Sequence, residues 1–395
     1  MKNFIKNLIV AVAGIVVLGA IYFYWHNLRG LLPVIKNPSG NIADIVEGQD
    51  QNSTNFPLKL PDGFSIEIFA KNLPGVRTMA WDSFGNIWVA RTSKGVVTEL
   101  EVKNGKVSSQ NDVFKNLKNP HGLAIEESTL YLAEETKISK VALYSEDSLH
   151  KLVDLPSSGG GHFTRTLGFG PDGRLYVSIG SSCNVCRESD ERRAAIYSMK
   201  KDGTDFKQYA KGLRNTVFFT WSYVDGSMWG TDNGRDLLGD NIPPDEINLL
   251  KEGGNYGWPN CYGNNVHDDN FDKNTYIRNP CMEPFETPAK VELQAHSAPL
   301  GLSFVPEEGW PEEYWYNLIV AFHGSWNRSI PTGYKLVRIK LDSKGHYLGT
   351  EDFLTGFLQG SSALGRPVGV YAQPGGVVYV TDDKAGVIYR IFRTK

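Results

Sequence analysis

The chain has 395 residues, enough for one large domain or two ordinary ones, and it is long enough to bury a sizeable core. Its formal net charge of −3 gives no electrostatic reason to expect a nucleic-acid partner. Aromatic residues make up 12% of the chain and glycine occurs 41 times, a composition that favours a β-rich fold with many turns.

The first predicted element is an apolar helix near the N-terminus. Residues 8–25 are uncharged and apolar, and their number is about what a helix needs to cross a bilayer. Lysines precede this run and aromatic residues close it, as in membrane-interface belts. The run ends in bulky residues and not in the small residues of a cleavage site, which favours a retained anchor. A cleaved signal peptide and a buried core helix remain the alternatives. We therefore expect an anchor or signal sequence over residues 1–28, a linker over 29–55 and one exported domain over 56–395.

A repeated pattern begins at residue 56. Each copy joins a turn rich in Asp, Gly or Glu to a short strand with an aromatic or β-branched centre, and most copies have a further apolar strand on each side. Spacings near 40–45 residues predict an all-β fold, a six-bladed β-propeller, whereas a two-sheet sandwich explains the spacing less well. The central residues of the six copies are Trp88, Tyr131, Tyr176, Trp229, Ile319 and Tyr379.

The two ends of this repeat region suggest how the ring closes. The early strand over residues 63–73 is expected to complete the last blade. The long step between Trp229 and Ile319 is expected to hold inserted loops over one face, where function tends to lie.

Four cysteines are the next feature. Cys183 and Cys186 form a C-x-x-C motif, and Cys261 and Cys281 lie 20 residues apart. A zinc site would need a second close pair, a c-type haem site would need His after the motif, and a redox motif normally opens a helix. In an exported domain we therefore expect two structural disulfides, one within a tight loop and one closing a longer excursion.

Polar or basic residues stand at strand edges in most copies of the repeat. A lone histidine before an apolar strand is more often structural, but repetition at similar positions favours a site at one end of the propeller axis. His and Arg side chains there would suit an anionic, planar ligand with carboxylates. These candidates are His121, His162, Arg165, Arg214, Asn215, His296, His323, Arg328 and Arg366.

A second group of candidates lies within residues 232–259. This segment contains many side chains with oxygen donors, and such ligands suit Ca²⁺ better than zinc. The spacing is not that of an EF-hand, and a solvated acidic loop is the alternative. The donors are Asp232, Asp236, Asp240, Asp245, Glu246 and Tyr256.

Residues 60–393 resemble the glucose/sorbosone dehydrogenases. The resemblance is carried by GLRN, by DEINLLKEGGNYGWP and by the pattern HxxxxLxxGPDGxLYVSIG, while HGLA, SSCNVC, HSAPLGL and HGSWNR are most similar to the sorbosone branch. Members of this family are six-bladed propellers that use pyrroloquinoline quinone (PQQ) and calcium. The resemblance therefore implies both cofactors.

The resemblance also implies roles for individual residues. His162 matches the catalytic base. Calcium ligands are implied at Glu246 through its side chain, at Tyr256 through its backbone, and at the carbonyls of Gly234 and Arg235, which would hold a second calcium against the cofactor. The expected cofactor-binding residues are His121, Arg165, Arg214, Asn215, His323, Arg328 and Arg366.

Two positions depart from the glucose-oxidising relatives. Ser181 stands where they carry an aspartate that supports the base, and His121 stands where they carry glutamine. We expect an oxidoreductase that transfers hydride from a sugar or sugar-derived aldehyde to PQQ and then reduces a separate acceptor, a cytochrome or a quinone. A calcium-dependent lactonase and a non-catalytic binding propeller are the alternatives.

Overall fold

The computed structural model describes residues 2–23, 52–157, 159 and 161–394. In helix α1 (Lys2–Phe23), the side chains of residues 3–23 are exposed. By length and composition Asn3–Phe23 could cross a membrane, a test that signal sequences near an N-terminus also pass. Residues 29–51 of the expected linker lie outside the described residues.

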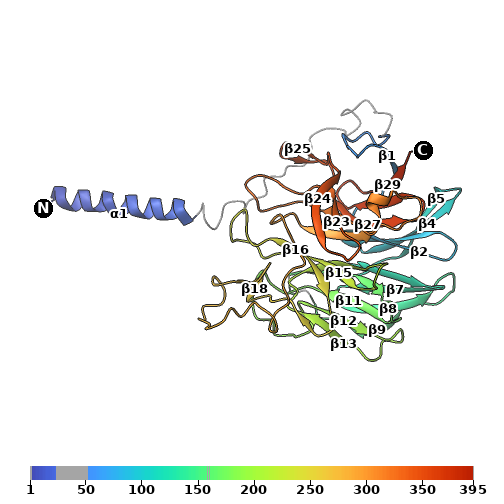
Figure 1. Cartoon of the computed structure of the whole chain (residues 1–395), viewed down its shortest axis with the longest axis horizontal. Coiled ribbons are helices and arrows are strands. Elements are labelled where there is room, and N and C mark those ends of the chain that lie inside the picture. The colour runs from blue at the N-terminus through green and yellow to red at the C-terminus, as the bar shows by residue number, and fades with distance from the viewer. Residues whose placement is uncertain (1, 24–51, 158, 160, 395) are drawn as a thin grey trace.

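The remaining chain forms six sheets, each with four antiparallel strands, arranged as the blades of a propeller (Figure 1). The strands of each blade are given from the centre outward. The first blade is β2 (Val76–Trp81), β3 (Ile87–Arg91), β4 (Val96–Lys103) and β5 (Lys106–Phe114), and the second is β6 (Gly122–Glu126), β7 (Thr129–Glu134), β8 (Lys137–Ala142) and β9 (His150–Asp154). The third is β10 (Leu167–Phe169), β11 (Leu175–Ile179), β12 (Ala195–Met199) and β13 (Lys207–Lys211). The next two are β14 (Thr216–Trp221), β15 (Met228–Asp232), β16 (Asp245–Leu250) and β20 (Val291–Leu293); and β21 (Pro299–Phe304), β22 (Leu318–Phe322), β23 (Lys335–Leu341) and β24 (Tyr347–Leu354). The sixth is β27 (Pro367–Gln373), β28 (Val377–Asp382), β29 (Val387–Arg393) and β1 (Phe64–Ala70).

The pattern of buried side chains explains why these segments form blades. Every residue of β11 and β22 is buried, because the second strand of a blade packs against a neighbouring blade on each face. The outer strand β5 instead has mostly exposed side chains. All six predicted central residues lie on the second strands, so the propeller prediction is confirmed and the sandwich alternative is wrong.

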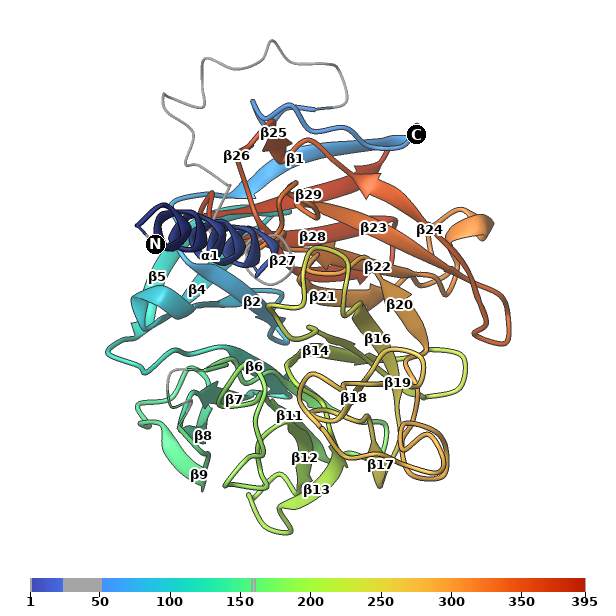
Figure 2. The ribbon, with the colours of Figure 1, turned by 90° about the vertical axis from the view of Figure 1, so that its left-hand side faces the viewer.

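The ring is closed by its two ends, as predicted. Strand β1 pairs antiparallel with β29, and Ile66 lies opposite Ile391. Figure 2 shows β1 (blue) beside β29 (red). The sixth blade therefore depends on hydrogen bonds between the first and last strands of the domain.

The long step in the repeat is an insertion between β16 and β20. It carries three two-residue strands. Strand β17 (Gly254–Asn255) pairs parallel with β13 at the edge of the third blade, and β18 (Cys261–Tyr262) pairs with β19 (Val266–His267). A disulfide between Cys261 and Cys281 closes this excursion, and a second disulfide joins Cys183 to Cys186. Both predicted pairings are confirmed. Another two-stranded pair, β25 (Leu358–Gln359) and β26 (Ser362–Ala363), lies between the last two blades along the chain.

Candidate functional site

The six inner strands line a narrow channel of about 140 Å³ along the propeller axis. Most sequence candidates lie just before an inner strand, and hydrogen bonds tie these strand starts together. Thr78 Oγ1 donates to the carbonyl of His121, and Thr166 Oγ1 lies 3.3 Å from His121 Nδ1. The fold therefore gathers the starts of neighbouring inner strands, as the repeat predicted.

A cavity of about 200 Å³ lies at this end of the channel. A more open depression of about 440 Å³ lies on the insertion, over residues 267–280, but it holds none of the sequence-predicted site residues. We place the candidate site in the smaller cavity because it collects groups from several blades. Its lining residues are His162, Arg214, Asn215, Asn233, Gly234, Asp236, Asp245, His296, Ala298, Trp326 and Asn327.

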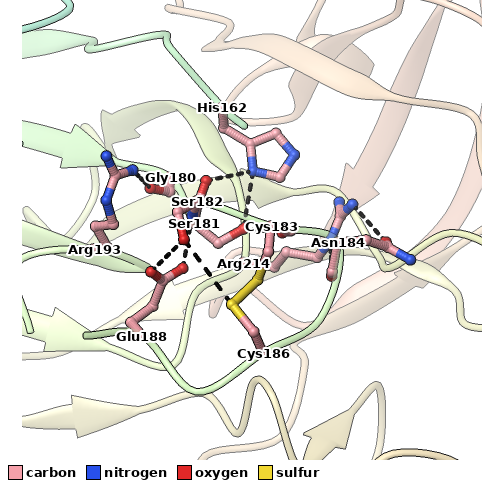
Figure 3. The surroundings of a disulfide bond; sticks show 10 residues. All are labelled: His162, Gly180, Ser181, Ser182, Cys183, Asn184, Cys186, Glu188, Arg193 and Arg214. Atoms are coloured by element: carbon pink, nitrogen blue, oxygen red, sulfur yellow. Dashed lines mark hydrogen bonds between the residues drawn. A yellow bond between two sulfur atoms is a disulfide. The ribbon is translucent and has the colours of Figure 1, made fainter. Parts of the chain in front are cut away.

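His162 is held in one tautomer by Ser181, two residues beyond the end of β11. Its Nδ1 lies 3.0 Å from Ser181 Oγ and 3.1 Å from the Ser181 carbonyl oxygen. Ser181 Oγ donates its own hydrogen to the Cys183 carbonyl at 2.7 Å, so both Ser181 atoms accept from His162. Nδ1 therefore carries the hydrogen, and Nε2, which points away from this loop in Figure 3, keeps a lone pair.

The surroundings of His162 keep its ring neutral. Burial, together with the positive charge of Arg214, lowers the pKa of His162 to about 3. The carbonyl of Ser181 opposes this shift only in part. A neutral imidazole with a bare Nε2 can accept a proton, which is what a general base requires.

Arg214 is fixed by contacts along its whole side chain. Asp232 accepts the backbone N–H groups of Arg214 at 3.0 Å and Asn215 at 2.6 Å, which sets the turn before β14. The guanidinium donates from Nε to the Asn184 carbonyl, from Nη2 to Asn184 Oδ1 and Asp236 Oδ2, and from Nη1 to the Asn233 carbonyl, all at 2.9–3.0 Å. Among the described residues, one N–H of Nη1 is left to meet a ligand.

Oxygen atoms make up much of the remaining lining. Asp245 accepts the backbone N–H groups of Gly234 and Ala298, each at 2.9 Å, and burial raises the pKa of Asp245 to about 7. Three lining asparagines each keep a buried side-chain oxygen without a hydrogen-bond partner among the described residues. Buried oxygens of this kind are uncommon in folded proteins and suit a cation or a donor from a ligand. They are Oδ1 of Asn215, Asn233 and Asn327.

A second charged cluster adjoins the cavity. The His323 N–H donates to the carbonyl of Ala298, a lining residue, at 3.0 Å. Asp383 pairs with Arg77 at 2.5 Å and with His323 Nε2 at 3.0 Å. Burial would raise the pKa of Asp383, but His323 and Arg77 outweigh it and hold that pKa below its usual range. Arg366 donates from Nε to the His323 carbonyl at 3.1 Å, so this cluster places two arginines beside the cavity.

Three predicted cofactor-binding residues support the site from outside its lining. The buried His121 ring packs edge-on against Phe218 inside the channel, and its Nε2 has no partner among the described residues. Arg165 is fully buried and donates to the carbonyls of His162 at 3.0 Å and Thr164 at 2.7 Å. Arg328 donates to the carbonyl of Asp240, which ties two loops at the cavity mouth together.

The predicted calcium ligands are spread more widely. Gly234 lines the cavity, and Arg235 Nη1 pairs with Asp268 at 2.6 Å. The Glu246 carboxylate, which is buried, accepts from the Gly263 N–H at 2.5 Å and from an asparagine side chain. The Tyr256 hydroxyl donates to the carbonyl of Leu249 at 2.6 Å. Glu246 and Tyr256 therefore lie outside the cavity lining.

The cavity also contains residues whose role sequence reasoning missed. Trp326 and Asn327 lie in the HGSWNR segment beside His323, so the motif itself was the available signal. Asn184, which contacts Arg214 from outside the lining, was also missed, because the CNVC motif that contains it drew attention only to its cysteines.

Fold and site together define a six-bladed β-propeller with a polar, partly cationic cavity at one end of its axis. Residues 58–394 match the model of the TrAA12-like family, and the chain belongs to that family.

Curated proteins and solved structures are also similar to this chain. An uncharacterized protein of Borreliella burgdorferi is 34% identical, over 86% of this chain and 91% of that protein. The pyrroloquinoline quinone-dependent pyranose dehydrogenase of Coprinopsis cinerea is 25% identical over 86% of this chain, which spans 55% of that enzyme. The calcium structure of the Trichoderma reesei carbohydrate-active enzyme family AA12 superposes with a TM-score of 0.72 at 21% identity, covering 87% of this chain and 100% of that one. At this identity the superposition is evidence for the fold alone.

Proposed function

We propose that this protein is a PQQ- and Ca²⁺-dependent oxidoreductase that oxidises a sugar or a sugar-derived aldehyde of the aldose or sorbosone type. The observation that carries the proposal is the bare Nε2 of His162 in a cavity that also holds Arg214. The activity named for the Coprinopsis cinerea relative supports the same chemistry.

The charged groups of the site suit PQQ, which is a tricarboxylate o-quinone. Arg214 offers a remaining N–H, and Arg366 and Arg77 add positive charge beside the cavity. When bound, PQQ supplies a two-electron acceptor and Ca²⁺ supplies the Lewis acid that polarises its carbonyl.

The oxygen atoms of the site suit Ca²⁺. Asn215 and Asn233 have unpartnered side-chain oxygens, Asp236 and Asp245 add carboxylates, and Gly234 adds a backbone carbonyl. Six to eight oxygen ligands are what this ion takes. The family resemblance adds the Arg235 carbonyl to this group and a further calcium at Glu246 and Tyr256.

His162 would act as the base. Its Nε2 accepts the hydroxyl proton of a hemiacetal or an aldehyde hydrate as the carbon is oxidised. Ser181 holds the opposite ring nitrogen, so the acquired proton has one position, Nε2, and the ring keeps its orientation. Trp326, which is about half exposed, offers an apolar surface at the cavity mouth for a sugar ring.

The N-terminal helix and the disulfides suggest where this reaction takes place. An exported propeller, anchored through α1 or secreted after cleavage, would meet its substrate outside the cytoplasm. It would pass electrons to a separate acceptor, a cytochrome or a quinone.

Dye reduction by the full chain tests this proposal. The protein, purified in detergent with PQQ and Ca²⁺, should reduce a redox dye with at least one member of a panel of aldoses and sorbosone. Omitting PQQ or adding a calcium chelator should remove that activity. Failure with every sugar, together with an unchanged PQQ absorbance on mixing, would exclude the oxidoreductase. Lactone hydrolysis under the same conditions would identify a hydrolase instead.

A further inference from the structure

The loop between Cys183 and Cys186 carries a contact set that its disulfide alone does not explain. Asn184 lies inside this loop, and its carbonyl and Oδ1 accept two hydrogen bonds from Arg214, at 2.9 and 3.0 Å. Its side chain also pairs with the backbone of Asp236. Oδ1 accepts the Asp236 N–H at 2.7 Å, and Nδ2 donates to the Asp236 carbonyl at 3.0 Å. One asparagine therefore joins the blade-3 loop to two residues of the cavity.

The same loop reaches the proposed base. Ser181 Oγ donates to the Cys183 carbonyl, and this bond directs the Oγ lone pairs toward His162 Nδ1. In Figure 3 the His162 ring lies next to Ser181 and the Arg214 guanidinium next to Asn184, so residues in and beside the disulfide-closed loop contact both side chains. Glu188 stabilises the loop by accepting hydrogen bonds from the N–H and Oγ–H of Ser182, at 2.6 and 2.7 Å.

We propose that Asn184 is a positioning residue and that the Cys183–Cys186 disulfide holds its loop so that Arg214 and His162 keep one shared geometry. Arginine has a long, flexible side chain, and a guanidinium held on three sides presents its remaining N–H in one direction. A disulfide that closes so short a loop restricts the positions of the carbonyls inside it. The disulfide therefore acts on the ligand site as well as on stability.

Amide exchange of the unloaded protein tests the positioning role without any ligand. In the wild type, the N–H of Asp236 is protected by Asn184 and the N–H of Ser181 by the Arg214 carbonyl. Asn184→Ala should speed hydrogen–deuterium exchange in peptides covering residues 181–187 and 233–237. Val185→Ala, in the same loop, is the matched control and should leave both peptides unchanged. Equal exchange in wild type and Asn184→Ala would overturn the proposal.

Affinity for PQQ gives a second readout, and it rests on the function proposed above. With Ca²⁺ present, Asn184→Ala should weaken PQQ binding about tenfold, measured by equilibrium dialysis. Asn184→Asp keeps the oxygen that accepts from Arg214 and Asp236 but replaces the Nδ2 donor to the Asp236 carbonyl with an acceptor, so it should recover only part of the affinity that Asn184→Ala loses. No recovery at all would mean that the contact with Arg214 does not contribute to PQQ affinity. If wild type bound no PQQ, the proposed function would fail while the exchange experiment still decided the role of Asn184.

The disulfide is tested against the second disulfide of the same protein. Cys183→Ser/Cys186→Ser should reproduce the fast exchange of Asn184→Ala at residues 181–187 and 233–237. Cys261→Ser/Cys281→Ser should lower the melting temperature but leave exchange at residues 181–187 unchanged; peptide 233–237 is left out of this comparison because Arg235 pairs with Asp268 inside the excursion that this disulfide closes. Equal effects of the two double variants on residues 181–187 would mean that loss of stability, and not of position, explains the result.

Discussion

His162 Nδ1 donates to two uncharged acceptors, both of which belong to Ser181. Nδ1 lies 3.0 Å from Ser181 Oγ and 3.1 Å from the Ser181 carbonyl oxygen. Neither acceptor carries a charge, and three arginines nearby disfavour the imidazolium form. The contact therefore fixes the tautomer of His162, and the rise in pKa that the Ser181 carbonyl causes is smaller than the fall that burial and Arg214 cause.

Replacing Ser181 with aspartate should place a negative charge beside His162 Nδ1. A carboxylate this close to an imidazole raises its pKa by about one to three units, because it stabilises the imidazolium. In Ser181→Asp, the acidic limb of the pH profile of kcat/KM should therefore move to higher pH. In the wild type, a pKa near 3 predicts a flat profile for this group between pH 5 and 8. The profile and the NMR titration of His162 measure the shift directly.

Ser181→Ala is the control for that variant. It removes Oγ but keeps the backbone carbonyl that accepts from Nδ1. The limb should stay where it is in the wild type, and activity should fall only modestly. An acidic limb in the same place in Ser181→Asp and Ser181→Ala would show that His162 is not the titrating base.

His162→Ala should abolish turnover with little effect on PQQ affinity. General-base catalysis contributes about 10²–10⁴-fold, so kcat should fall by at least that lower factor. Arg214 and its contacts with Asn184 and Asp236 do not involve the His162 side chain, so the cofactor groups should remain in place. Steady-state kinetics and equilibrium dialysis give the two values. Near wild-type turnover in the variant would remove His162 from the reaction.

The burial of His162 also predicts how stability depends on pH. Its pKa is near 6.5 in the unfolded chain and about 3 in the folded protein. Between these values the unfolded chain binds a proton that the folded protein does not, so the free energy of unfolding falls as pH falls. One such proton contributes a slope of up to about 1.4 kcal/mol per pH unit. Urea unfolding of His162→Gln between pH 4 and 6.5 should show a shallower slope than wild type, whereas equal slopes would place the histidine in solvent.

The repeat predicted the fold because each copy carries the same physical signal. A turn followed by a buried, aromatic strand recurs wherever a blade needs a second strand packed on both faces, and Trp88 and Tyr379 are buried or half-buried at equivalent positions. The closing strand was also predictable, since a first strand without a blade of its own has one place to pair.

The site was predictable only where its residues precede inner strands. His162 and Arg214 stand at such positions, and the cavity contains both. Arg165 stands at a similar position, but its guanidinium donates to backbone carbonyls and does not reach the cavity lining. No sequence pattern reveals this difference. Asn184 comes from a loop whose path depends on a disulfide and on blade packing, so its contact with Arg214 follows from the fold alone.

Ile66 tests the closure of the ring. It is almost fully buried on β1, opposite Ile391 on β29, and it packs in the cluster that joins the last two blades. Ile66→Ala should lower the free energy of unfolding by about 2–5 kcal/mol, because it removes buried methyl groups and leaves a cavity at the closing seam. Ile68→Ala, two residues along the strand and partly exposed, is the matched control and should cost less. Urea unfolding followed by tryptophan fluorescence measures both. A loss below about 1 kcal/mol for Ile66→Ala would mean that the packing of β1 side chains at the closing seam contributes little to the stability of the propeller.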